Sequence, residues 1–158
     1  MAYGVANYFS ISVYICVQNP FLGGHAILKL DIVIPVYNEQ ENLPNLQIRL
    51  IKACEKLENM AWQVIYVNDG SSDRSLEIMH RQRESDSRFS IVELSRNFGH
   101  QAAITAGLSC STGDAVILMD GDLQDPPELI PKLISRWKGG ANVVRAHRRS
   151  RKEKGMRR

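Results

Sequence analysis

Three clusters of polar residues are the part of the sequence most able to carry chemistry. They are Tyr37-Asn38-Glu39, Asn68-Asp69-Gly70 and Asp120-Gly121-Asp122, and each lies at the end of a short run rich in Val and Ile. Asp120 and Asp122 are separated by one small residue, so both carboxylates can turn toward one hard divalent cation. Asn, Asp and Gly also favour ordinary turns, and this alternative stays open for any one cluster alone.

The elements that would position these clusters alternate regularly along the chain. Apolar runs typical of buried parallel strands are predicted at residues 31–37, 62–68, 89–95, 115–120 and 142–147. Helices are predicted between them, at about 43–58, after Ser72 or Asp73, at 100–109 and from Pro126 to Gly139. This order predicts an α/β fold, with a mainly parallel sheet and helices on both faces. Ligands of such sheets bind beyond the carboxyl ends of the strands, so the three clusters are expected at one edge.

The length and composition predict one globular domain. The chain has 158 residues, of which 44% are hydrophobic and 23% charged, as an ordinary core with a solvated surface requires. Cys16, Cys54 and Cys110 show no paired metal-ligand spacing, so neither a disulfide framework nor a zinc site is predicted. The apolar stretch at 8–17 is shorter than the roughly 20 residues of a transmembrane helix. No segment is therefore expected to cross a membrane.

The net charge of +3 hides an uneven distribution. Residues 145–158 hold eight Lys and Arg against one Glu, whereas residues 1–144 hold twelve Lys and Arg against sixteen Asp and Glu. The positive charge therefore gathers at the end of the sequence, where it could attract anionic lipid head groups or nucleic acid.

Two common nucleotide-binding motifs are missing from the sequence. Neither a Gly-rich dinucleotide fingerprint nor a P-loop follows the first predicted strand, which disfavours classical NAD binding and P-loop phosphate binding. A receiver-like signalling domain also gathers aspartates at strand ends. It needs an acidic pair after the first strand and a lysine after the last. This chain has Asn38-Glu39 and Arg145-Ala146 at those places, which disfavours a receiver-like domain.

Four segments of the chain carry the most distinctive order of motifs. They are DIVIPVYNEQENLPNL (31–46), VNDGSSDRS (67–75), SRNFGHQAAITAGL (95–108) and MDGDLQDPPELIPKL (119–133). Together they resemble the inverting family 2 glycosyltransferases of the GT-A fold. The likeness is strongest to the branch that passes a sugar from a nucleotide sugar to a polyprenyl phosphate, such as dolichol-phosphate mannose synthases and bactoprenol-phosphate glucosyltransferases.

The resemblance also implies how the chain is organised. It covers about residues 30–152 as a nucleotide-sugar-binding domain, leaves residues 1–29 unassigned and makes residues 153–158 a basic tail. The implied fold is a GT-A, Rossmann-like α/β/α domain with a mainly parallel sheet. This chain is expected to lack the C-terminal part of that domain.

The resemblance implies a nucleotide-binding role for six residues. They are Pro35, Tyr37, Glu39, Asp69, Arg96 and Asp120. Asp69 matches the position whose carboxylate accepts a hydrogen bond from the base. A strand end and a half-buried aromatic would also explain Pro35 and Tyr37, and a solvated turn would also explain Arg96.

The same resemblance implies a metal-dependent reaction. Asp120 and Asp122 match the metal and diphosphate site and are the candidate catalytic residues, and Gln124 matches a further metal ligand. Mg²⁺ or Mn²⁺ is the implied cofactor, because a divalent cation neutralises a departing nucleoside diphosphate. His100 is expected to begin a helix rather than to act as a base.

The basic segment at 143–151 resembles the part of the family that faces the acceptor phosphate. This implies that Arg148 and Arg151 bind that phosphate, although Arg145 stands where the family pattern tends to be uncharged. A basic tail attracted to anionic lipid would also explain these arginines.

The implied function is transfer of a sugar, with inversion, from a nucleotide-diphosphate sugar to a polyprenyl phosphate. A UDP-sugar is the favoured donor and GDP-mannose is the other. The implied partners are the donor, the polyprenyl phosphate and a membrane surface, with no nucleic acid, at the cytoplasmic inner face of the membrane. The alternative is a nucleotide-sugar-binding fragment without catalysis, because the sequence stops before the family's acceptor-site loops.

Overall fold

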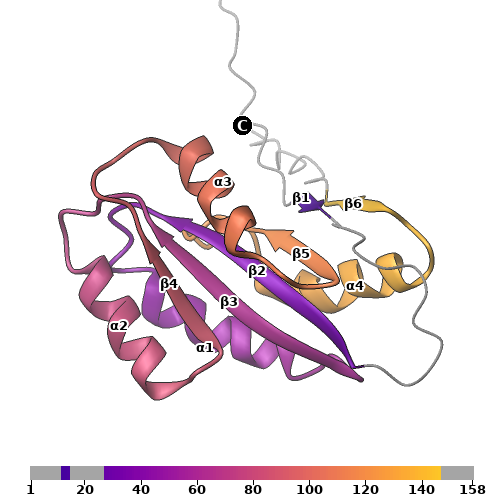
Figure 1. The fold of residues 1–158 in the computed structure, drawn as a ribbon. Coiled ribbons are helices and arrows are strands. Elements are labelled where there is room, and N and C mark those ends of the chain that lie inside the picture. The colour runs from indigo at the N-terminus through magenta and orange to yellow at the C-terminus, as the bar shows by residue number, and fades with distance from the viewer. Residues whose placement is uncertain (1–11, 15–26, 147–158) are drawn as a thin grey trace, which may run out of the picture.

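A six-stranded sheet with the order β4-β3-β2-β5-β1-β6 forms the centre of the fold (Figure 1). The computed structural model describes residues 12–14 and 27–146. The strands are β1 (Ser12–Tyr14), β2 (Leu28–Val36), β3 (Met60–Asn68), β4 (Phe89–Glu93), β5 (Ala115–Leu118) and β6 (Val143–Arg145). β2 pairs in parallel with β3 and β5, and β3 pairs in parallel with β4. The carboxyl ends of these four strands therefore lie at one edge, as the sequence predicts.

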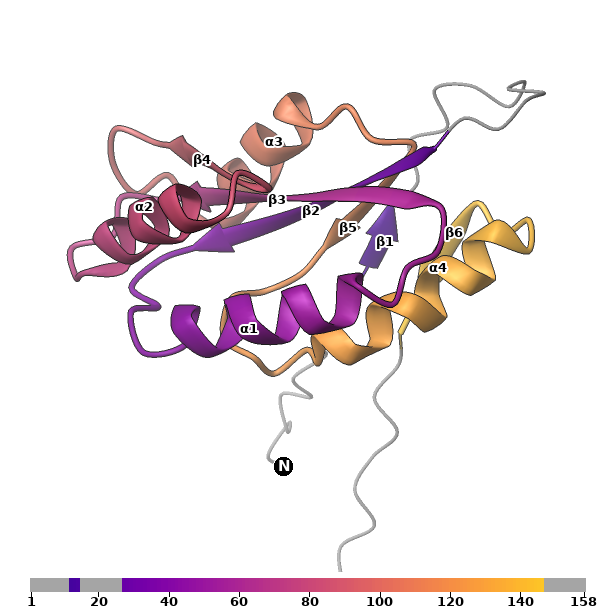
Figure 2. The same ribbon diagram turned by 90° about the horizontal axis from the view of Figure 1, so that it is seen from below.

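Helices cover both faces of the sheet, which confirms the predicted three layers. α1 (Leu43–Cys54), α2 (Ser75–Ser85) and α4 (Ile130–Lys138) lie on one face, and α3 (His100–Cys110) lies on the other (Figures 1 and 2). α1 ends at Cys54, before the predicted residue 58, and the chain then turns into β3 through Asn59, whose φ is 54°. A 3-10 turn at Pro127–Leu129 precedes α4. None of the helices in the described part of the chain is long and apolar enough to span a bilayer.

The central strand β2 is buried on both of its faces. Leu30, Ile32 and Ile34 pack in the larger core, together with α1, α2 and α4. Val33 points to the opposite face and packs in a smaller core with Ala103 of α3. Successive side chains of a strand alternate between faces, so one apolar run supplies both cores.

The short strand β1 comes from the N-terminal part that the sequence analysis left unassigned. Val13 pairs antiparallel with Ile117 of β5 on one side and with Val144 of β6 on the other. β6, the last of the predicted strands, therefore joins the sheet through β1 instead of pairing with β5. A three-residue strand is too short to show a periodic pattern, which is why the sequence did not predict it.

A buried carboxylate fixes the start of β5 against β2. Asp31 is fully buried, and its Oδ2 accepts hydrogen bonds from the backbone N–H groups of Thr112 (2.7 Å) and Gly113 (2.8 Å). Lys29 Nζ lies 3.7 Å from Asp31 Oδ1. These donors and the nearby cation offset the cost of burying the charge. The contact sets the position of β5, and hence of Asp120 beyond its far end.

A glycine lets α3 lie directly on the sheet. A Cβ atom at Gly107 would meet Val33 Cγ1 at 2.3 Å and Val67 Cγ2 at 2.9 Å. Both distances are too short for carbon contacts, so a larger residue would push the helix away from β2 and β3. The close packing of α3 matters for the site, because the first residue of this helix is His100.

Gly107→Ala should lower the free energy of unfolding by about 1–3 kcal/mol, as overpacking of a core does. The loss should appear although Ala favours helix over Gly by about 1 kcal/mol. Urea denaturation measures it, with exposed Ser109→Ala on the same helix as a control that should stay within about 0.5 kcal/mol of the parent. A Gly107→Ala variant as stable as the parent would contradict the close packing of α3.

Candidate functional site

A cleft of about 250 Å³ lies beyond the carboxyl ends of β2, β3 and β5. The residues that line it are Pro35, Val36, Tyr37, Glu39, Asp69, Asn97, Gly99, His100, Asp120, Gly121 and Asp122. All three polar clusters of the sequence contribute to this lining. The structure therefore brings together Pro35, Tyr37, Glu39, Asp69, Asp120 and Asp122, as the parallel arrangement predicts.

The loop after β2 is held by the loop after β3. The backbone N–H of Glu39 donates to Ser75 Oγ at 2.7 Å, and the side chain of Asn38 accepts from the backbone N–H of Ser72 at 2.8 Å. Asn38 has a φ of 56°, a conformation that Asn tolerates better than most residues. Tyr37 remains 50% exposed at this wall of the cleft, so its ring is free to stack on a flat ligand.

Asp69 lines the cleft and already has hydrogen-bond partners. Its side chain is 3% exposed, Oδ1 accepts from the backbone N–H of Phe98 at 2.7 Å, and Oδ2 accepts from that of Gly99 at 3.0 Å. Recognition of a base by Asp69 stays a prediction. The contacts show a second task for this carboxylate, which is to hold the loop before α3.

Asp120 and Asp122 reach the cleft from the loop after β5. Asp122 Oδ1 accepts the backbone N–H of Gln124 at 2.9 Å, and Leu123 between them has a φ of 61°, which makes a tight turn. Burial raises the pKa of Asp120, the nearby His100 opposes this shift, and the Asp122 carboxylate adds to it. Bound positive charge would relieve both the burial cost and the repulsion between the two carboxylates.

Asp120 and Asp122 fit a divalent cation that takes only part of its ligands from the protein. Within residues 12–14 and 27–146, no three His, Cys, Asp or Glu side chains gather closely enough to hold a metal by themselves. Mg²⁺ commonly takes one or two protein carboxylates and completes its shell with phosphate oxygens and water. Asp120 and Asp122 supply such a partial set of hard oxygen ligands.

Two residues implied for the donor site do not line the cleft. The guanidinium of Arg96 stacks on the Phe98 ring, 4.6 Å from its centre, and the side chain of Gln124 is exposed. Arg148 and Arg151 lie outside the described residues. The roles implied for these four residues stay predictions.

Gly99 and His100 line the cleft, which the sequence does not predict, and Asn97, the neighbour of the candidate Arg96, lines it as well. His100 begins α3, as expected, but its Nε2 also lies 3.7 Å from Asp120 Oδ1. The sequence could have indicated these residues only by their position along the chain, and not by their residue types. The loop before α3 follows a parallel strand, as the loops that carry the three polar clusters do.

Comparison with known families and proteins supports the resemblance. The family described as "Glycosyl transferase family 2" matches residues 31–158. Undecaprenyl-phosphate 4-deoxy-4-formamido-L-arabinose transferase of Salmonella choleraesuis is 47% identical over 128 residues, which are 80% of this chain and 39% of that protein. The enzyme of the same name from Salmonella paratyphi B gives the same values. The chain thus spans about 39% of the length of these relatives.

Solved structures of glycosyltransferases share the fold. S. aureus TarS (residues 1–349) superposes with a TM-score of 0.61 at 21% identity, over 71% of this chain and 33% of that one. The mannosyltransferase PcManGT from Pyrobaculum calidifontis, in complex with GDP-Man and Mn²⁺, superposes with a TM-score of 0.53 at 21% identity. The superposition covers 59% of this chain and 27% of that one. These likenesses confirm the expected glycosyltransferase architecture.

Asp120→Asn should raise the free energy of unfolding of the metal-free protein at pH 7. Burial raises the pKa of Asp120, so its charge opposes folding at neutral pH, and the amide carries no charge. The gain should shrink as the pH falls through the raised pKa, because the parent side chain is then also neutral. Urea denaturation at pH 7 and at acid pH measures the difference.

Asp86→Asn is a control of opposite sign. A hydrogen bond from Arg88 lowers the pKa of Asp86, so this carboxylate stabilises the fold above its unfolded pKa, and its replacement should destabilise the protein at pH 7. If Asp120→Asn destabilises the protein at pH 7 in the same way, the electrostatic description of the cleft is wrong.

Proposed function

Since this chain belongs to glycosyl transferase family 2, we propose that its cleft binds a nucleotide-diphosphate sugar and that the protein transfers the sugar to a polyprenyl phosphate. The observation that carries the proposal is the meeting of all three polar clusters in one cleft at the carboxyl edge of the sheet. The relatives' name, undecaprenyl-phosphate 4-deoxy-4-formamido-L-arabinose transferase, supports the acceptor class. We favour a UDP-sugar as donor, with GDP-mannose as the other candidate.

The lining suggests how the donor would lie. The exposed ring of Tyr37 offers a stacking surface for the base, and Pro35 and Glu39 line the same cleft. The diphosphate would lie toward Asp120 and Asp122, whose carboxylates alone would repel it. A bound Mg²⁺ or Mn²⁺ would reverse that repulsion and neutralise the departing nucleoside diphosphate.

The reaction would be a direct displacement at the anomeric carbon. A phosphate oxygen of the acceptor forms the new bond, the bond to the nucleoside diphosphate breaks, and the configuration inverts. A phosphate monoester is already anionic near neutral pH, so the cleft does not need a strong base. We assign the acceptor phosphate to Arg148 and Arg151.

Asp120→Ala and Asp122→Ala should each weaken UDP binding in the presence of Mn²⁺ by about 1–3 kcal/mol, the size of a lost charged interaction. Titration calorimetry with and without EDTA measures the effect, and the parent should bind UDP more weakly in EDTA. Glu84→Gln, an exposed carboxylate on α2, is the control. The Asp120→Ala/Asp122→Ala double variant should bind UDP more weakly than the parent. Equally tight binding would show that these aspartates hold no metal.

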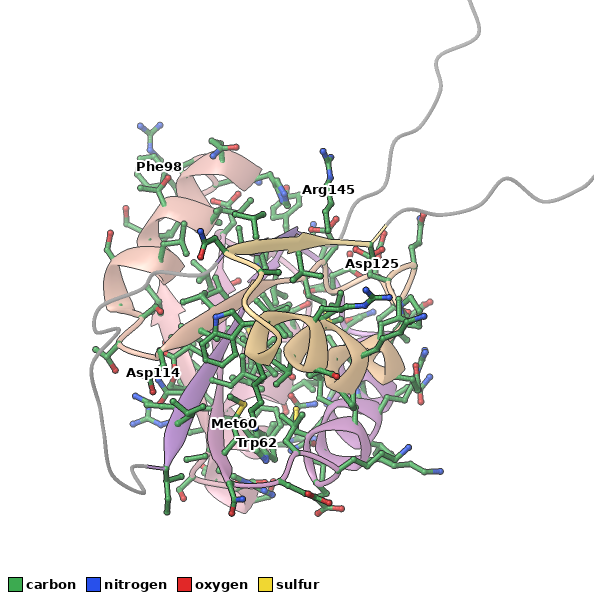
Figure 3. All side chains as sticks on the ribbon, turned by 90° about the vertical axis from the view of Figure 1, so that its right-hand side faces the viewer. Met60, Trp62, Phe98, Asp114, Asp125 and Arg145 are labelled. Atoms are coloured by element: carbon green, nitrogen blue, oxygen red, sulfur yellow. The ribbon has the colours of Figure 1, made fainter. Side chains whose placement is uncertain are left out.

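We also propose a surface that meets the membrane of the lipid acceptor. A cavity of about 490 Å³ lies between α4 and β6 and is lined by the cations Lys132, Arg136 and Arg145 beside apolar side chains such as Leu133 and Val144. In Figure 3, β6 lies beside α4, and the Arg145 side chain points away from the helix. No described residue that lines the cavity is acidic.

Charge complementarity points to anionic phospholipid head groups as the occupant of this surface. The sequence contains no Asp or Glu from residue 129 to residue 146. Lys132 and Arg136 form no ion pair within the described part of the chain. Cations beside apolar side chains suit a surface of anionic head groups over acyl chains.

Lys132→Gln combined with Arg136→Gln should weaken binding to vesicles that contain phosphatidylglycerol by about 1 kcal/mol per charge removed. Binding to pure phosphatidylcholine vesicles should be weak in both proteins. Co-sedimentation measures the difference, and Lys52→Gln with Arg83→Gln removes the same charge from exposed positions on α1 and α2. An equal loss in both double variants would assign the attraction to net charge and not to the surface between α4 and β6.

A further inference from the structure

We propose that Asp69 is a positioning residue for the diphosphate half of the donor site. Its carboxylate holds the loop of residues 96–100, and this loop forms the wall of the cleft beside Asp120. Binding of the diphosphate then depends on Asp69 whichever base the nucleotide carries. The inference rests on the proposed function, because it takes the cleft to be the donor site.

The first observation is the direction of the Asp69 hydrogen bonds. Both carboxylate oxygens accept backbone N–H groups of one loop, from Phe98 at 2.7 Å and from Gly99 at 3.0 Å. The side chain is 3% exposed, so water competes little for these bonds. Hydrogen bonds from N–H groups to a carboxylate are stronger than neutral ones. The carboxylate therefore ties the end of β3 to the start of α3.

The second observation is the close approach of the same two segments at Gly70. A Cβ atom there would lie 2.4 Å from the backbone N of Asn97 and 2.5 Å from the carbonyl carbon of Arg96. Gly70 also has a φ of 66°, which favours glycine. The backbone N–H of Leu94 donates to the carbonyl of Asn68 at 3.0 Å. The turn after β3 and the loop before α3 are thus in direct backbone contact.

The third observation is what the held loop presents to the cleft. Asn97, Gly99 and His100 line it, and His100 Nε2 lies 3.7 Å from Asp120 Oδ1. Phe98 instead projects outward beside α3 (Figure 3), where Arg96 stacks on its ring. Release of the loop would therefore change the wall next to Asp120 without any direct contact between Asp69 and the diphosphate.

Two roles of Asp69 make different predictions for a ligand without a base. An ionised carboxylate has about four acceptor sites, so Asp69 could also accept a hydrogen bond from a base while it holds the loop. Contact with the base alone would leave the binding of pyrophosphate unchanged when Asp69 is altered. The positioning role requires pyrophosphate and UDP to lose affinity together.

The experiment compares Mn²⁺-pyrophosphate with Mn²⁺-UDP by titration calorimetry. Asp69→Asn retains the shape of the side chain. It replaces one carboxylate oxygen by an NH2 group, which cannot accept a hydrogen bond from the backbone N–H of the loop. The substitution should lower the affinity for both ligands by a similar factor, roughly tenfold for one lost charge-assisted hydrogen bond. Amide hydrogen exchange at Phe98 and Gly99 should speed up in the same variant. Asp86→Asn, a carboxylate near the end of α2, should leave both affinities unchanged.

Gly70→Ala displaces the loop while the Asp69 carboxylate stays intact, and it decides the question if Asp69→Asn does not fold. It should also weaken pyrophosphate and UDP together. Unchanged pyrophosphate binding in a folded variant, with weaker UDP binding, overturns the positioning role and leaves Asp69 as a base contact. A parent chain that binds neither ligand refutes the proposed function, and this inference with it.

Discussion

The double parallel pairing of β2 is the constraint on which the rest of the structure depends. Val36 of β2 stands opposite Asn68 of β3, and Val33 stands opposite Leu118 of β5. The three strands therefore end close together, and the polar residues that follow them meet. The buried Asp31 secures this arrangement at the other end, since it binds the backbone just before β5.

Hydrogen bonds between loops then convert the shared edge into a defined cleft. Asn38 accepts a backbone N–H group of the loop after β3, and Asp69 accepts two from the loop before α3. Turn chemistry and ligand binding are therefore not exclusive explanations of the polar clusters. Some members hold the backbone, whereas Asp120 faces the cleft with a raised pKa because burial and the Asp122 carboxylate both disfavour its charge.

The sequence predicted the fold well wherever a residue pattern reports burial. The Val- and Ile-rich runs predicted the positions of the four parallel strands, because strands buried on both faces are apolar throughout. The membership of Asp69 and Asp120 in one cleft followed from parallel topology alone. The strand β1 could not be predicted, since its three residues are identified only by their pairing with Ile117 and Val144.

The parts of the site that sequence reasoning missed depend on close approach in space. Gly70 permits the contact with Asn97, and no spacing rule shows which distant backbone that glycine will meet. His100 was predicted correctly as the start of a helix, but its distance from Asp120 depends on how closely α3 packs on the sheet through Gly107. Such tertiary contacts, rather than local propensity, decide which residues share the cleft.

We propose that Asp120 and Asp122 hold a divalent cation together with the diphosphate of a nucleotide. A crystal structure of the chain with UDP and Mn²⁺, with data collected at the manganese absorption edge, would locate the metal. We expect one anomalous peak. It should lie within coordination distance of a carboxylate oxygen of Asp120 or Asp122 and also of an oxygen of the diphosphate. UDP bound outside the cleft, or a manganese peak remote from both aspartates, would show that the two aspartates do not form a metal and diphosphate site.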